Sequence, residues 1–220
     1  MKGPDASREF WTEFDWEKEL RKDDERVHTY LRELPKFIDL PQEEALIFQK
    51  IQRREELIPH GGVWPFEQVT EHLDEEAKEE ERAFRESWYS REGADIYIAC
   101  SKLGRGYCML SVMDPDASGC EDCIRLLAYL GKIMARLMDI IDLAPGELPA
   151  LRIALSKRIL SDINEIIGLN AKLIRRAVSE EACAHLLSQG AQLGLLREMT
   201  RDMLARARHP EKDKPDGPRD

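Results

Sequence analysis

Three long stretches in the second half of the sequence repeat apolar residues every three or four positions, which is the period of an amphipathic helix. They run from about residue 121 to 141, from 151 to 177 and from 180 to 203. In the first stretch the apolar residues cover most of the circumference, which indicates a central, largely buried helix. Helices of this length pack side by side, so the sequence predicts a mainly α fold, a multi-helix bundle.

A different pattern occupies about residues 95–113. Apolar and β-branched residues alternate over Asp95–Ser101 and again over Tyr107–Met113, with two glycines between the runs. Alternation on both sides of a glycine-containing turn is typical of a β-hairpin, and the sequence predicts one here. Because an isolated hairpin is marginally stable in water, it would have to pack on a helix or pair with a second copy, so a homodimer is among the expected assemblies.

Composition divides the chain into three parts. Residues 1–92 are expected to form an acidic, aromatic-rich helical segment, and residues 93–208 the β-hairpin and the helical bundle core, with both parts in one compact domain. Residues 209–220 contain three prolines and no apolar anchor, which predicts a disordered tail.

Charge and hydropathy narrow the classes of partner. The chain has 33 basic and 43 acidic side chains, a net charge of −10 at pH 7, which disfavours nonspecific binding to nucleic acid or to an anionic membrane. No apolar run is long enough to span a bilayer. The odd number of cysteines, five at irregular spacing, does not match a secreted disulfide framework. We therefore expect a cytoplasmic protein that does not bind membranes.

The sharpest chemical motif is Cys120-Glu-Asp-Cys123, just before the first long helix. Helix N-terminal amides stabilise a thiolate, so this pair is a candidate redox or metal site. The motif resembles the C-x-x-C of thioredoxin-like proteins, although no βαβ unit surrounds it. It is also similar to that of the helical peroxidase-partner family related to carboxymuconolactone decarboxylase, but Leu127 stands where that family has a histidine. The competing interpretation is that Cys123 is a small core residue.

All four tryptophans, Trp11, Trp16, Trp64 and Trp88, lie in the first 88 residues among many charges. Tryptophan is enriched at interface hot spots, so these residues are candidates for partner binding. The alternative is that they anchor the N-terminal segment to the bundle.

No arrangement of nucleophile and base stands out, so no catalytic residue, cofactor or dedicated metal site is predicted. The acidic stretch between Glu67 and Glu80 is interpreted as a solvated helix face. The sequence favours a noncatalytic protein–protein interaction protein, that is, an adaptor, regulator or assembly subunit. The alternatives are a thiol redox or metal-binding protein that uses Cys120 and Cys123 and, as the weakest, a nucleic-acid accessory protein that uses the basic C-terminal helices.

Overall fold

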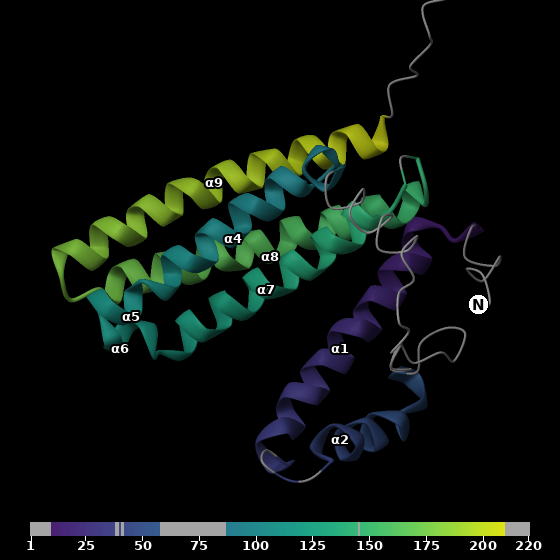
Figure 1. Ribbon diagram of the computed structural model, residues 1–220, viewed down its shortest axis with the longest axis horizontal. Helices are drawn as coiled ribbons and strands as arrows, with labels where there is room; N and C mark the ends of the chain where they lie inside the picture. Colours follow the sequence, from purple (N-terminus) through teal and green to yellow (C-terminus); the bar gives the residue numbers. More distant parts are fainter. Residues whose placement is uncertain (1–9, 38–39, 41, 58–86, 145, 210–220) are drawn as a thin grey trace, which may run out of the picture. The chain divides into compact units, whose positions relative to one another are not determined.

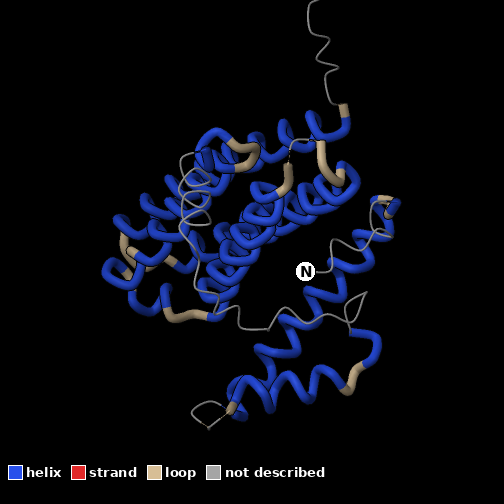
Figure 2. The backbone as a smooth tube through the Cα atoms, turned by 45° about the vertical axis from the view of Figure 1, so that its right-hand side comes forward, coloured by secondary structure: helices blue, strands red, loops and turns tan. Residues whose placement is uncertain are grey.

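The computed structural model describes residues 10–37, 40, 42–57, 87–144 and 146–209. The chain divides into two compact units, residues 1–72 and 73–220. Every regular element in the described parts of the chain is a helix, as Figure 2 shows. The mainly α prediction is therefore confirmed. Trp64, the acidic stretch from Glu67 to Glu80 and nearly all of the predicted disordered tail lie outside the described residues.

The first unit contains a pair of helices and a short 3-10 turn, α1 (Glu13–Phe37), α2 (Glu43–Gln52) and η2 (Glu55–Leu57). Among the described residues of this unit, Ile47, Ile51 and Leu57 form a small buried apolar cluster, and four partly buried apolar side chains pack against it. Those four are Tyr30, Leu34, Phe37 and Phe48. The C-terminal half of α1 therefore packs against α2 and η2.

The second unit is a four-helix bundle with short connecting helices. Its elements are η3 (Trp88–Ser90), α4 (Ala94–Cys108), α5 (Leu110–Met113), α6 (Pro115–Ser118), α7 (Glu121–Asp142), α8 (Pro149–Arg176) and α9 (Glu180–Arg208). Helix α8 packs against α7 and α9, and α4 packs against the same two helices, so the four long helices enclose one core (Figure 1). The three long stretches of apolar periodicity in the sequence correspond to α7, α8 and α9.

The predicted β-hairpin at residues 95–113 is wrong, because that segment forms α4 and α5. Ile96, Cys100, Leu103 and Tyr107 recur every three or four residues, and all four are buried on one side of α4. The same residues therefore satisfy a helical period as well as a local alternation. The glycines at 104 and 106, which were interpreted as a turn, lie inside the helix.

Local sequence explains where the last two long helices begin. Pro149 occupies the first turn of α8, where a missing N–H costs nothing. Ser179 precedes α9 with an extended backbone, and its hydroxyl oxygen accepts a hydrogen bond of 3.0 Å from the Ala182 amide. This is an N-cap, which satisfies one of the unpaired amides of the first turn. No helix in the described parts of the chain is long and apolar enough to cross a membrane.

Candidate functional site

The start of α1 is a rigid local structure built around two of the predicted tryptophans. Thr12 and Asp15 form a capping box, in which the Asp15 carboxylate accepts hydrogen bonds from the Thr12 amide (2.9 Å) and hydroxyl (2.6 Å). These bonds lower the pKa of Asp15. Trp11 and Trp16 flank the box, and their ring centroids are 4.7 Å apart in an edge-on arrangement. The pair is a hydrophobic staple that fixes the direction in which the chain enters the helix.

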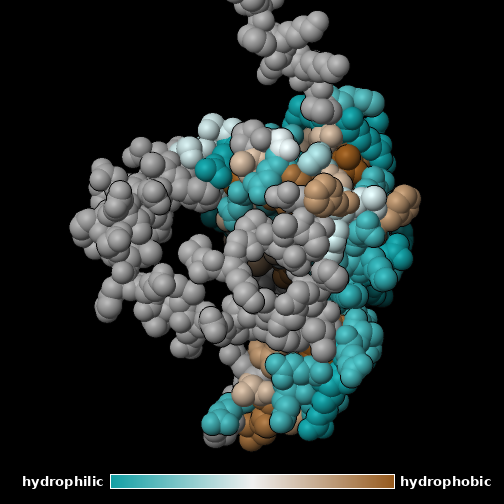
Figure 3. Space-filling model, turned by 90° about the vertical axis from the view of Figure 1, so that its right-hand side faces the viewer, coloured by the Kyte–Doolittle hydropathy of each residue, from teal (hydrophilic) through white to brown (hydrophobic). Residues whose placement is uncertain are grey.

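The staple leaves two other aromatic side chains in solvent. Phe10 and Phe14 are each 84% exposed, whereas Trp16 is only 8% exposed and Trp11 is half-buried. We call Phe10 and Phe14 the phenylalanine surface. On the side of the molecule shown in Figure 3, the described surface is mostly hydrophilic and its hydrophobic side chains lie in small patches. Among the described large apolar side chains, Val178 at 87% is more exposed than these two phenylalanines, which are the most exposed aromatic ones.

Of the other two predicted tryptophans, Trp64 lies outside the described residues and Trp88 belongs to the second unit. Trp88 is half-buried in the second unit, where its ring packs edge-on against Tyr89 and Tyr97 at 5.2 and 5.3 Å. Sequence reasoning singled out tryptophans and passed over the phenylalanines beside them. The T-x-x-D capping box at residues 12–15 could have distinguished the tryptophans from the phenylalanines. A tryptophan directly before the box and another directly after it are the expected members of a hydrophobic staple.

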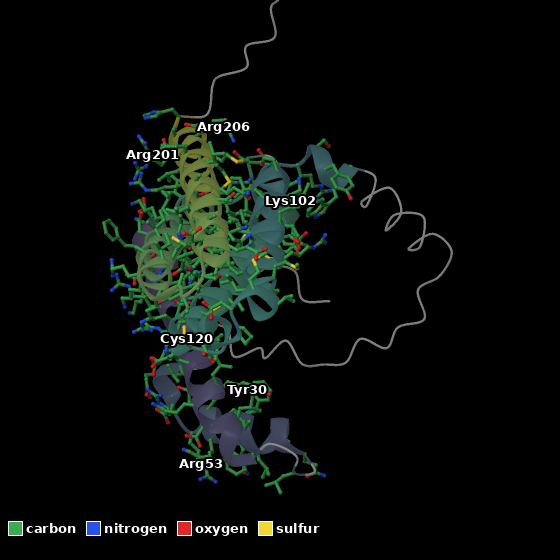
Figure 4. All side chains as sticks on the ribbon, turned by 90° about the vertical axis from the view of Figure 1, so that its left-hand side faces the viewer. Tyr30, Arg53, Lys102, Cys120, Arg201 and Arg206 are labelled. Carbon is green, nitrogen blue, oxygen red and sulfur yellow. The ribbon has the colours of Figure 1, made fainter. Side chains whose placement is uncertain are left out.

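Cys120 and Cys123 lie at the start of α7, near the label for Cys120 in Figure 4. Cys120 is the N-cap residue and is half-buried, whereas Cys123 is fully buried. Burial, with smaller contributions from Cys120 and Cys108, raises the pKa of Cys123 to about 11. The buried cysteine is therefore held in its neutral form. Among the described residues, no three His, Cys, Asp or Glu side chains are grouped so that they could hold a metal ion.

A set of buried polar side chains joins three helices near the C-terminal ends of α4 and α8 and the start of α9. The Tyr107 hydroxyl of α4 donates a 2.9 Å hydrogen bond to the Asn170 side-chain oxygen of α8. The Asn170 amide nitrogen in turn donates to the Leu186 carbonyl of α9 at 3.2 Å. Tyr107 is 0% and Asn170 4% exposed, so both bonds lie in the protein interior. These bonds fix the register of α4, α8 and α9.

The contact between α4 and α9 is close because residue 106 is glycine. His185 Nε2 lies 2.8 Å from the Gly106 carbonyl oxygen, and because a carbonyl can only accept, His185 carries its proton on Nε2. A Cβ atom at position 106 would lie 2.4 Å from the Gln189 side-chain nitrogen. Gln189 itself is only 6% exposed. This region is tightly packed protein interior and has no room for a ligand.

A cleft of about 940 Å³ lies at the opposite end of the bundle from Cys120, where α7 ends and α8 begins. Arg152 lines it and is 7% exposed. Its guanidinium donates to the carbonyl oxygens of Leu143 and Ala144, both at 2.8 Å, and to the Glu92 carboxylate at 3.0 Å. Arg152 therefore caps the C-terminal end of α7, so this buried cation is already engaged by the protein.

Comparison with known proteins gives no relative, since no family model, no curated protein and no solved structure matches this chain.

Proposed function

We propose that this chain is a noncatalytic protein–protein interaction protein, an adaptor, regulator or assembly subunit, that binds its partner through the phenylalanine surface. The observation that carries the proposal is the 84% exposure of both Phe10 and Phe14. Burial of a phenylalanine side chain is worth about 1.5–3 kcal/mol, so two such side chains leave a large free energy to be gained by binding. The proposal includes the cytoplasmic location that the sequence predicts and needs no cofactor.

Preorganisation supports the same conclusion. The capping box and the Trp11–Trp16 staple order the backbone on both sides of Phe14 before any partner binds. A side chain on an ordered helix start loses less conformational entropy on binding than one in a flexible segment. The phenylalanine surface is therefore suited to insert into an apolar groove of another protein, as helix anchors do.

The charge around the phenylalanines indicates the chemistry of the partner. Between Phe10 and Glu19 the chain has four carboxylates, Glu13, Asp15, Glu17 and Glu19, and one lysine. Part of this negative charge stabilises the helix N-terminus. The excess also favours a partner whose apolar groove has a basic rim, because complementary potentials increase the association rate.

The proposal is tested by affinity purification of the full chain from lysate of its own cells, with quantification by mass spectrometry. Phe10→Ala/Phe14→Ala should lose a stoichiometric protein that wild type retains. The loss should be smaller at low salt concentration, where the attraction between the carboxylates of α1 and the basic rim of the partner is screened less. Val178→Ala is the matched control, because Val178 is 87% exposed in the second unit and lies outside the proposed surface. Equal recovery with the double variant and wild type, or no stoichiometric protein with either, contradicts the proposal.

A further inference from the structure

The start of α7 brings two thiols together on one turn of backbone. Cys120 is the N-cap residue, and Cys123 is the third residue of the helix. The Cys123 amide donates a 3.1 Å hydrogen bond to the Cys120 carbonyl oxygen, which closes a turn of four residues. A turn closed in this way keeps its first and last Cα atoms within about 7 Å of each other. A disulfide requires Cα atoms about 4.4–6.8 Å apart, so the backbone spacing suits a bond between the two cysteines.

Side chains at these two helix positions are neighbours. In a capping box the N-cap side chain reaches towards the third helical residue, and the side chain of that residue reaches back towards the N-cap. In α7 both positions carry a thiol, and the Cys120 side chain makes no capping hydrogen bond. Burial raises the pKa of Cys123, and Cys120 raises it further by repulsion, so the two thiols lie within electrostatic reach of each other.

The two thiols differ in their access to solvent, and this difference assigns them different roles. Cys120 is half-buried, whereas Cys123 is fully buried. Thiol–disulfide exchange begins when an accessible sulfur attacks a disulfide, and a second sulfur then displaces the leaving group. Cys120 also lies at the N-terminal end of α7, where the helix dipole favours negative charge. Cys120 is therefore suited to attack, and Cys123 is reached only from inside the protein.

We propose that Cys120 and Cys123 form a reversible disulfide by exchange with a small-molecule disulfide of the glutathione type. Cys120 loses its proton and attacks one sulfur of oxidised glutathione, which forms a mixed disulfide, and the glutathione thiolate that leaves takes up a proton. Cys123 then attacks the Cys120 sulfur, the mixed disulfide breaks, and the proton of Cys123 passes to the second glutathione. Two protein thiols and one glutathione disulfide become one protein disulfide and two glutathione thiols. Excess reduced glutathione reverses both steps, so the site responds to the redox state of its surroundings.

Treatment of the reduced full chain with oxidised glutathione, followed by acid quenching and mass spectrometry, tests the proposal. A protease that cleaves before aspartate places Cys108, Cys120 and Cys123 on three different peptides. We expect the peptides of Cys120 and Cys123 to remain linked until a reductant is added. Cys108 is the competing thiol, because it is exposed and also contributes to the raised pKa of Cys123. A bond from either cysteine to Cys108, or no link between the two peptides, overturns the proposal.

Serine variants test the two roles separately. Cys123→Ser should stop after the first step and retain one glutathione on Cys120, because the displacing sulfur is gone. In Cys120→Ser, glutathione should add to the buried Cys123 at least about tenfold more slowly than it adds to Cys120 in Cys123→Ser. Cys108→Ser is the matched control and should leave the rate of disulfide formation unchanged.

Far-UV circular dichroism establishes that each variant is folded. Equal rates of glutathione addition to Cys120 and Cys123 overturn the assigned roles, and so does a Cys123→Ser variant that retains no glutathione on Cys120. None of these substitutions touches α1, so they fail or succeed independently of the phenylalanine surface.

Discussion

Replacing Gly106 with alanine should destabilise the bundle, although alanine is the better helix former. The added Cβ atom would lie 2.4 Å from the Gln189 side-chain nitrogen and 2.7 Å from its carbon and oxygen. Ordinary contacts of this kind begin near 3.4 Å. Gln189 cannot swing into solvent without leaving a buried position, because it is 6% exposed. The helices or the glutamine must therefore shift.

The size of the effect follows from two opposing contributions. Overpacking a buried site costs about 1–3 kcal/mol. Removing a glycine from a helix interior contributes about 0.5–1 kcal/mol in the other direction. We therefore expect Gly106→Ala to lower the free energy of unfolding by about 1 kcal/mol in urea titrations followed by circular dichroism at 222 nm.

Two further variants separate the clash from the helix propensity. Gly104→Ala is on the same helix, and its Cβ would meet no atom within 4 Å in the described part of the chain, so it should be neutral or stabilising. Gly106→Ala in a Gln189→Ala background should behave like Gly104→Ala, because the clashing amide is gone. If Gly106→Ala is as stable as Gly104→Ala in the wild-type background, the close approach of α4 and α9 is refuted.

Three other predictions concern single side chains. Tyr107→Phe should cost about 1–3 kcal/mol of unfolding free energy, because it leaves the buried Asn170 oxygen without its donor; an unchanged urea midpoint would contradict this hydrogen bond. Hydrogen bonds from Lys36 and Lys50 lower the pKa of Glu33 from 4.5 to about 2. The folded state therefore binds a proton at Glu33 less readily than the unfolded state does. The ionised carboxylate stabilises the fold, and this stabilisation is lost as the pH falls from about 4.5 towards 2. Glu33→Gln should therefore lose less stability than wild type on acidification in urea titrations, and equal losses would argue against the ion pairs. Iodoacetamide should alkylate the exposed Cys108 long before the buried Cys123, whose pKa is about 11. The two rates are measured by mass spectrometry of the labelled peptides. Comparable rates would instead favour the alternative function, a thiol redox or metal-binding protein.

The long helices could be predicted from the sequence because each shows many turns of one period. Over α7, from Cys123 to Ile141, a helical pattern fits and an alternating one does not. The segment from Ile96 to Tyr107 is different, since its apolar residues fit both periods over a short length. Its glycines favoured a turn when considered alone. The role of Gly106 could be recognised only from the fold, because this glycine leaves room for Gln189, a residue 83 positions later in the sequence.

The candidate site was predictable only in part for a related reason. The aromatic richness near the N-terminus is evident from composition, but which aromatic rings are exposed depends on the helix start. Trp11 and Trp16 pack on each other, whereas Phe10 and Phe14 are exposed. The pKa of Cys123 depends on the burial of its side chain in the bundle, which a C-x-x-C spacing does not reveal.

Contact between Phe14 and another protein can be measured by replacing it with a benzophenone-bearing phenylalanine and irradiating cells that express the full chain. The substituted side chain remains aromatic, so binding should survive and a covalent adduct to one distinct protein should form. The same group at Val178, which is equally exposed in the second unit, should give no such adduct. An adduct from position 14 that Phe10→Ala abolishes is the result we predict. No adduct from position 14, or the same adducts from both positions, would contradict a binding role for the phenylalanine surface.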